Sequence, residues 1–293
     1  ALGRHAMLTT FVPIRYRARS MSALGGTLRF GWFVGPFLAA GAIELTGWTG
    51  VVFVIQLVAC ALTVLALLVF GSPEKAFGLR EPVPATGAVE VRTEALGLVA
   101  TLRERRDVLL TLGVGAMMMM GLRASRAIVL PLWAVSIGLD ETATSLIVGL
   151  AGLFDFSLFL AGGWAMDRFG RMRTIIPAAL GLGAGHLILA FTHDLPAAVA
   201  WFTAVTMFLS IANGFSAGML MTLGSDLAGP RDPAPFLGAW RFTIDVGGAV
   251  TPLFVAGVTA VASISLAVGA LGMMGIVSAI IMRVFIPRKL GRR

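Results

Sequence analysis

Long apolar runs alternate with short polar segments along this chain of 293 residues. A helix needs about 20 mostly apolar residues to cross about 30 Å of hydrocarbon, and eight runs reach or approach that length. The runs are too long and too continuous for the alternating pattern of a membrane barrel strand. The sequence therefore predicts an all-α membrane protein with eight spanning helices, at residues 21–45, 49–71, 108–134, 142–164, 174–192, 196–224, 235–259 and 263–286.

The longest uncharged run must contain a turn. Residues 246–282 include no Asp, Glu, Lys or Arg. At about 1.5 Å per residue this run makes about 55 Å of helix, which is more than one crossing needs. Small and β-branched residues cluster at 258–263, so we expect the chain to reverse there.

The composition supports a lipid environment. Hydrophobic residues make up 57% of the chain and charged residues 13%, against about 45–50% and about 25% in ordinary soluble domains. These values exclude a disordered chain and a water-soluble enzyme. The one cysteine, Cys60, lies in an apolar run, so neither a disulfide framework nor a cysteine metal site is expected.

The positive charge is distributed unevenly. The net charge is +8, and 19 of the 23 basic residues fall in the termini and in every second connection between the predicted helices. The other connections, at 45–48, 135–141, 193–195 and 260–262, contain none. Cytoplasmic loops of membrane proteins are enriched in Lys and Arg. The pattern therefore predicts a multi-pass protein of the cell membrane with both ends of the chain in the cytoplasm, and a lipid bilayer rather than nucleic acid as its partner.

One polar segment divides the apolar runs. Residues 72–107 carry charges and prolines and are predicted to form a cytoplasmic linker between membrane domains at 1–71 and 108–293. Two predicted spans precede this linker and six follow it. Two equal halves would require four more spans before the first residue, so we expect an N-terminally truncated chain.

A short motif lies between the fourth and fifth predicted spans. Glycine, acidic and basic residues occur there at fixed spacing: Gly163, Asp167, Arg168, Gly170, Arg171 and Arg173. This loop resembles the G-x-x-x-D-R-x-G-R-x-R/K loop of the major facilitator superfamily. The resemblance implies a transporter fold of two six-helix bundles, in which the eight spans are equivalent to helices 5–12 of 12. The alternative is a loop that is merely basic.

The first predicted span carries a second pattern. Gly31, Gly35 and Pro36 resemble the glycine-rich signature of drug:proton antiporters, although alanines stand where that signature ends in a glycine pair. The segment 26–30 (GTLRF) is also similar to 238–242 (GAWRF), six spans later. Parallel halves of a transporter place equivalent helices at this separation, whereas the alternative is chance similarity in a biased alphabet.

Ionisable residues inside membrane helices usually face a cavity and a partner. Arg123 and Arg126 lie at a predicted depth similar to that of Asp155 on the next helix, so one of the two arginines is expected to pair with Asp155. Two roles stay open for this pair. It is either a structural salt bridge, or it lines a cavity for an anionic or polar substrate and takes part in proton coupling.

Further polar residues lie in other spans. Arg241 and Asp245 are four residues apart on one helix and share a face. Arg29 is the counterpart of Arg241, and both arginines could instead reach the interface with their side chains. Asn213 is a candidate donor of neutral hydrogen bonds to a substrate, and His186 is expected to be a packed or lipid-facing residue.

These patterns predict a function. The resemblance implies a secondary active transporter that moves a small solute by alternating access, with proton coupling and with drug or metabolite efflux as one direction. The alternative is a non-transporting membrane sensor or assembly subunit on the same scaffold. The sequence contains no nucleotide-binding loop, catalytic motif or metal-ligand spacing, so we expect no enzyme activity, no cofactor and no metal. The expected partners are a small-molecule substrate and a proton or another coupling ion.

Overall fold

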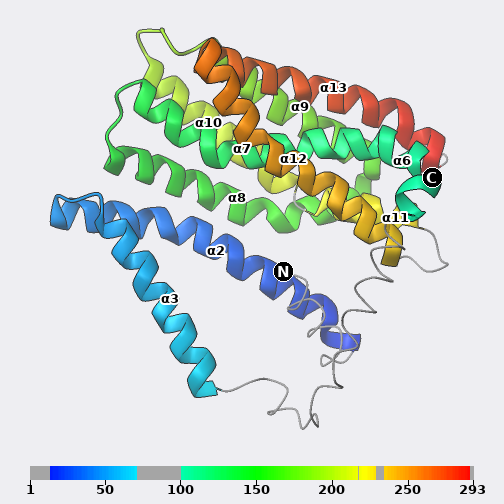
Figure 1. Ribbon diagram of the computed structural model, residues 1–293, viewed down its shortest axis with the longest axis horizontal. Helices are drawn as coiled ribbons and strands as arrows, with labels where there is room; N and C mark the ends of the chain where they lie inside the picture. Colours follow the sequence, from blue (N-terminus) through cyan, green and yellow to red (C-terminus); the bar gives the residue numbers. More distant parts are fainter. Residues whose placement is uncertain (1–13, 71–99, 217, 229–233, 291–293) are drawn as a thin grey trace. The chain divides into compact units, whose positions relative to one another are not determined.

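The computed structural model describes residues 14–70, 100–216, 218–228 and 234–290. Within these ranges the regular structure is entirely helical, which confirms the predicted all-α class. The long apolar runs explain this, because a helix satisfies all of its backbone hydrogen bonds internally and lipid supplies none. In chain order the helices of Figure 1 are α2 (Ile14–Thr46), α3 (Val51–Phe70), α6 (Arg106–Val108), the π-helical turn η1 (Leu109–Gly113), α7 (Val114–Ser136), α8 (Glu141–Phe169), α9 (Arg171–Ala190), α10 (Ala198–Phe215), α11 (Met219–Ala228), α12 (Ala234–Val261) and α13 (Ile264–Leu290).

Six helical segments in the described part of the chain are long and apolar enough to cross a membrane. They are Arg106–Ser136, Glu141–Phe159, Arg171–Ala190, Ala198–Ala228, Pro235–Val261 and Ile264–Leu290. The first two predicted spans coincide with helices α2 and α3. The apolar stretch of α3, Val51–Ala66, is shorter than the six. The chain is therefore a multi-pass membrane protein.

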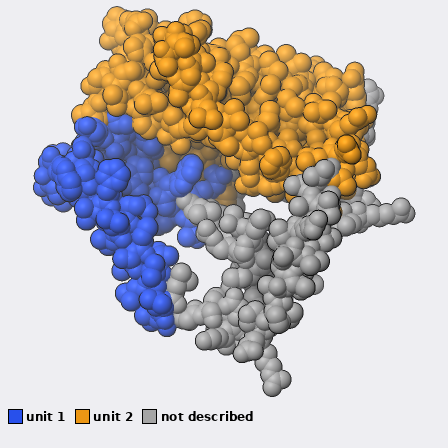
Figure 2. Space-filling model, viewed as in Figure 1, with its two compact units in different colours: residues 1–88, 141–149 blue, residues 89–140, 150–293 orange. Residues whose placement is uncertain are grey.

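The chain divides into two compact units (Figure 2). One unit contains α2, α3 and residues 141–149 of α8, and the other contains α6, η1, α7, the rest of α8 and α9–α13. Most of the predicted linker at 72–107 lies outside the described residues, so its extent stays a prediction. The part of the predicted N-terminal domain before residue 14 also lies outside the described residues.

The predicted reversal near 258–263 is confirmed. Helix α12 ends at Val261 and α13 begins at Ile264. Ser263 lies between them, and its hydroxyl oxygen accepts a hydrogen bond from the backbone N–H of Leu266 at 3.1 Å. A serine in this position satisfies one of the N–H groups that a helix start leaves without a partner.

The predicted span at 196–224 coincides with the apolar segment Ala198–Ala228, but this segment is interrupted. The run at 196–224 forms two helices, because α10 ends at Phe215 and α11 begins at Met219. Gly218 has φ +74°, a left-handed conformation that favours glycine and that cannot continue a helix. The Ser216 hydroxyl donates to the carbonyl of Asn213 at 2.8 Å, which satisfies a group near the end of α10. The apolar pattern could not indicate the interruption, since the residues on both sides of it are equally apolar.

Helices α9 and α13 pack closely along glycines (Figure 1). A Cβ atom added to Gly275 would lie 2.5 Å from the Cα atom of Gly183 and 3.0 Å from the carbonyl oxygen of Ala179. Small residues let membrane helices approach to this distance. Because lipid tails are as apolar as the helices, van der Waals contact between the helices, rather than the hydrophobic effect, stabilises their packing. Helix α7 packs mainly against α12 and α13.

We predict that Gly275→Ala destabilises the protein. The atoms that the new methyl group would meet belong to the backbone of α9, so the two helices must separate. Overpacking of this kind costs about 1–3 kcal/mol in the free energy of unfolding. Thermal denaturation of the detergent-purified protein measures the change. Gly269→Ala on the same helix is the control, because its added Cβ would lie 3.5 Å from the Ala190 side chain, an ordinary contact. Equal melting temperatures for the two variants would contradict the prediction.

Candidate functional site

Four polar side chains from three helices meet inside the larger unit. Arg126 of α7 forms an ion pair with Asp155 of α8, with Nη1 and Oδ2 separated by 3.3 Å. Helix α10 supplies two neutral groups. Ser210 accepts a hydrogen bond from Nη2 of Arg126 at 2.5 Å, and Nδ2 of Asn213 donates to the same Asp155 oxygen at 2.5 Å. The predicted pairing of Asp155 with an arginine of α7 is thus present, and Arg126 is the partner.

The cluster is largely shielded from solvent. The side chains of Arg126 and Asp155 are 11% and 10% exposed, and Ser210 is fully buried. Two charges removed from water are stable only if their geometry is good and their remaining polar atoms are satisfied. Ser210 and Asn213 perform that second task. The carbonyl oxygen of the Asn213 side chain is buried, and no hydrogen-bond partner lies near it among the described atoms.

Glycines bring α8 and α10 together at this point. A Cβ atom on Gly162 of α8 would overlap the carbonyl oxygen of Phe215. A Cβ atom on Gly214 of α10 would lie 3.0 Å from the Asp155 carbonyl oxygen. The two backbones can therefore cross in near contact. As a result the side chain of Asp155 reaches Asn213, the residue that precedes Gly214.

Arg123 lies one turn before Arg126 on α7 and has a different partner. Its Nη1 donates to the backbone carbonyl of Ser216 at 2.8 Å. Ser216 is the first residue after α10, where the helix is interrupted. The same carbonyl accepts from the backbone N–H of Met219 at 3.3 Å, so two donors meet at the interruption, and at membrane depth backbone groups must find such partners inside the protein. The sequence predicted a polar role for Arg123 but gave no indication of this contact.

The loop motif connects α8 to α9 through Gly170, which has φ +84°. This left-handed conformation explains the glycine. Arg171 is the first residue of α9, and its guanidinium binds both carboxylate oxygens of Asp226 on α11, at 2.6 and 3.3 Å. A positive charge at a helix N-terminus is unfavourable by itself, and the Asp226 carboxylate balances it.

The other motif residues behave differently. Arg168 lies over the ring of Trp164 at 5.4 Å from its centre, a cation–π contact, and Arg173 is exposed. Gly163 lies within α8. The side chain of Asp167 lies outside the described residues. Asp226 is the partner that sequence reasoning missed, since it is 55 residues away from Arg171.

Two of the remaining predicted residues form an ion pair of their own. Arg241 and Asp245 of α12 form the expected pair at 2.7 Å, and each side chain is 47% exposed. Arg29 lies on α2 in the smaller unit. Gly31, Gly35 and Pro36 also lie on α2, and a Cβ atom added to either glycine would meet no described atom within 4 Å. The described residues therefore give no packing reason for these two glycines.

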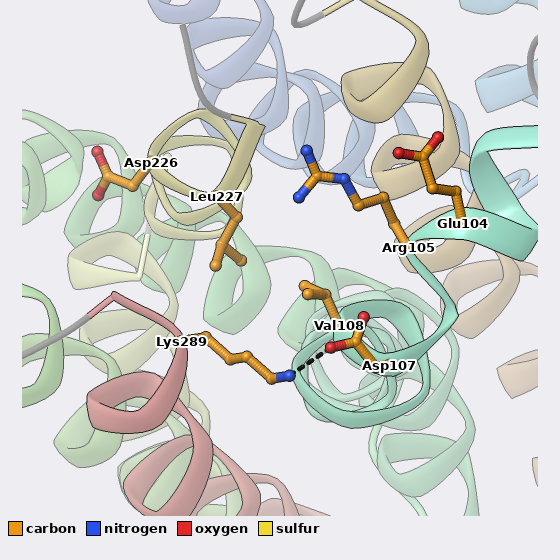
Figure 3. A pocket seen from close by; sticks show the side chains of 7 residues that line it. All are labelled: Glu104, Arg105, Asp107, Val108, Asp226, Leu227 and Lys289. Atoms are coloured by element: carbon orange, nitrogen blue, oxygen red, sulfur yellow. Dashed lines mark hydrogen bonds and ion pairs between the residues drawn. The ribbon is translucent and has the colours of Figure 1, made fainter. Parts of the chain in front are cut away.

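A pocket of about 560 Å³ opens where α6, α11 and the end of α13 meet (Figure 3). Its lining carries charges of both signs, and Lys289 donates to Asp107 at 2.5 Å across it. Asp226 lines the pocket too, so the pocket and the loop motif share one end of the helix bundle. We call this end the basic end, defined by Arg171, Asp226 and Lys289. The pocket shares no residue with the buried cluster, so the two are separate features.

A bundle of apolar helices around a buried, hydrogen-bonded ion pair defines a polytopic membrane protein with an internal polar site. The family model of the Major Facilitator Superfamily matches the chain over residues 2–252 and again over 112–293. The chain belongs to the Major Facilitator Superfamily, and its class of activity is secondary transport rather than enzyme catalysis.

Comparison with other known proteins agrees at the level of the fold. No curated protein matches the sequence. Among solved structures, the chain resembles the crystal structure of a D-xylose-proton symporter with a TM-score of 0.66 and 17% sequence identity. The match covers 98% of this chain and 68% of the symporter. At this identity the likeness concerns the fold alone.

We predict that Arg171→Lys weakens the connection between α9 and α11. Lysine keeps the charge but lacks the planar fork that binds both oxygens of Asp226. A double-mutant cycle of Arg171→Ala and Asp226→Ala should give a coupling of about 1 kcal/mol in the free energy of unfolding, given a half-shielded bidentate pair. Arg173→Ala is the matched control, because this exposed arginine belongs to the same turn of α9. A coupling no larger than that between Arg173 and Asp226 would show that the ion pair contributes nothing.

Proposed function

We propose that the chain is a proton-coupled transporter of a small polar solute, and that Asp155 carries the coupling proton. The observation that carries this proposal is the buried cluster in which one carboxylate oxygen of Asp155 accepts from both Arg126 and Asn213. An arginine stays charged at all relevant pH values, whereas a carboxylate can gain a proton when its charged partner moves away. Within the cluster, Asp155 is therefore the group that can exchange a proton.

The cluster suits Asp155 in both charge states. As a carboxylate, Asp155 is stabilised by the guanidinium of Arg126 and by the N–H of Asn213. As a neutral carboxyl group, it has an O–H that needs an acceptor. Rotation of the Asn213 amide by half a turn would present its carbonyl oxygen, which lacks a hydrogen-bond partner among the described atoms. Asn213 can therefore satisfy either form, which a second carboxylate or a lysine could not do.

Protonation of Asp155 would make Arg126 available to the solute. The guanidinium then has N–H donors that a carboxylate or a pair of hydroxyl groups can accept. Small polar solutes with such groups are the substrate class that we propose. Because a D-xylose-proton symporter shares this fold, a proton gradient and a hydroxyl-bearing solute are the first case to test.

The interrupted helix supports alternating access. Transporters of this type bind their substrate near the middle of the bilayer, where broken helices and their backbone groups line the site. Arg123 binds the carbonyl of Ser216 at such a break, close in sequence to Asn213 of the cluster. A movement of α11 relative to α10 would therefore change the site without breaking a regular helix.

We also propose that the basic end faces the cytoplasm of the cell and that the protein resides in the cell membrane. Arg168, Arg171 and Lys289 all lie in the terminal turns of helices at that end, while the connections at the opposite end hold no Lys or Arg. The distribution of basic residues sets the orientation of membrane proteins because positive loops are retained on the cytoplasmic side.

We predict that Asp155→Asn separates solute exchange from proton coupling. Proteoliposomes containing the full chain are given an imposed proton gradient and labelled D-xylose or, as an anionic solute, labelled L-lactate. Asparagine keeps the size and a hydrogen-bonding capacity but cannot carry a proton. Gradient-driven accumulation should therefore fall at least about tenfold, which corresponds to about 1.4 kcal/mol. Exchange of solute at equal concentrations should persist.

Asp194→Asn is the control, because Asp194 is an almost fully exposed carboxylate outside the helices. Accumulation by the Asp155 variant at the parental level would exclude Asp155 as the proton carrier. If the Asp245→Asn variant lost accumulation and the Asp155→Asn variant did not, the role of proton carrier would belong to Asp245 in its pair with Arg241 on α12.

A further inference from the structure

His186 is a buried titratable residue for which the proposed mechanism has no use. It lies on α9 with no exposed surface. Its Nδ1 lies 2.8 Å from the carbonyl oxygen of Leu182, and its Nε2 lies 2.8 Å from the hydroxyl oxygen of Ser125 on α7. The sequence indicated a packed or lipid-facing residue. The structure shows instead a packed residue with both ring nitrogens in hydrogen bonds.

The two partners fix the tautomer of the neutral ring. A carbonyl oxygen can only accept, so Nδ1 must carry the proton that it donates to Leu182. Nε2 is then an acceptor, and the hydroxyl of Ser125 donates to it. The carbonyl of Leu122, at 2.8 Å, is a second acceptor for the same hydroxyl, whose single proton is therefore shared between Leu122 and His186. Without His186, Ser125 would bond only within its own helix, and this polar link to α9 would be lost.

Ser125 is the residue directly before Arg126. Successive residues of a helix point about 100° apart. The rotation of α7 that directs Ser125 toward His186 on α9 therefore directs Arg126 toward Asp155 on α8 and Ser210 on α10. A hydrogen bond that fixes the angle of Ser125 also fixes the angle of the guanidinium.

A second histidine provides a natural comparison. His193 follows α9, and its Nε2 lies 3.2 Å from the hydroxyl of Ser136 at the end of α7. Both histidines thus connect a serine of α7 to α9 or to the loop that follows it. Ser136 lies ten residues beyond Arg126, which is close to three helical turns. The contact between His193 and Ser136 therefore cannot set the direction of the Arg126 guanidinium.

We propose that His186 is a positioning residue, which acts through Ser125 to hold Arg126 against Asp155. This inference rests on the proposed role of the Arg126–Asp155 pair in transport. It predicts that His186 and Asp155 are coupled energetically, although both ring nitrogens of His186 bind other groups.

The first experiment is a double-mutant cycle that needs no transport. Four forms of the full chain are purified in detergent: the parent, His186→Leu, Asp155→Asn and the double variant. Each is then unfolded reversibly. Independent sites change the unfolding equilibrium constant by factors that multiply to within about twofold, whereas coupled sites deviate more. We expect a deviation of threefold or more for His186 with Asp155, and none for His193→Leu with Asp155→Asn. Multiplicative effects in both cycles would overturn the proposal.

The second experiment is rescue in proteoliposomes. His186→Gln places an amide near the position of Nε2 and can keep the bond to Ser125, whereas His186→Leu and Ser125→Ala cannot. We expect proton-driven accumulation of the labelled solute within about threefold of the parent for the Gln variant, and a loss of tenfold or more for the other two. Equal loss in the Gln and Leu variants would overturn the proposal. A parent that transports neither probe would count against the proposed function but leaves the thermodynamic cycle intact.

A spectroscopic measurement checks the hydrogen bonds directly. Nitrogen-15 NMR of the histidine-labelled protein distinguishes a ring protonated at Nδ1 from one protonated at Nε2. His186, assigned by its loss in His186→Gln, should carry its proton at Nδ1, and Ser125→Ala should shift its Nε2 resonance. A neutral ring protonated at Nε2 would overturn the proposal.

Discussion

Inside a bilayer every charge and every backbone group must find its partner within the protein, because lipid tails offer none. In the larger unit of this chain, Arg126, Asp155, Ser210 and Asn213 form hydrogen bonds with one another. Just after α10, Arg123 donates to the Ser216 carbonyl, which also accepts from the backbone N–H of Met219. These bonds constrain the relative orientation of α7, α8 and α10, the helices that carry them.

Glycine makes those angles possible. Contacts at Gly162, Gly214 and Gly275 are with backbone atoms of the neighbouring helix, which cannot move aside as a flexible side chain does. The helices therefore approach to a fixed distance, and short side chains such as Asp155 and Asn213 can bridge them. In a soluble protein bulky apolar residues would fill such crossings. In lipid the gain comes from close contact and from polar bonds that are protected from water.

The sequence predicted the spans, the reversal between α12 and α13, and the pairing of Asp155 with an arginine, because these depend on hydropathy and on helical depth. It did not predict the break between α10 and α11, since Gly218 lies within an uninterrupted apolar run and glycine is ordinary in membrane helices. Asp226 as the partner of Arg171, and Ser125 as the partner of His186, also escaped prediction. Such contacts depend on which helices are neighbours, and spacing along the chain does not contain that information.

The short helix α11 is held at both ends by arginines from other helices. Arg123 binds the Ser216 carbonyl just before it, and Arg171 binds Asp226 near its last turn. Its ten residues span about 15 Å, a rod too short to bend appreciably. α11 therefore behaves as a lever with one end beside the buried ion pair and the other at the surface loop. A displacement of either end is therefore transmitted to the other, so that the loop motif and the polar cluster belong to one mechanical unit.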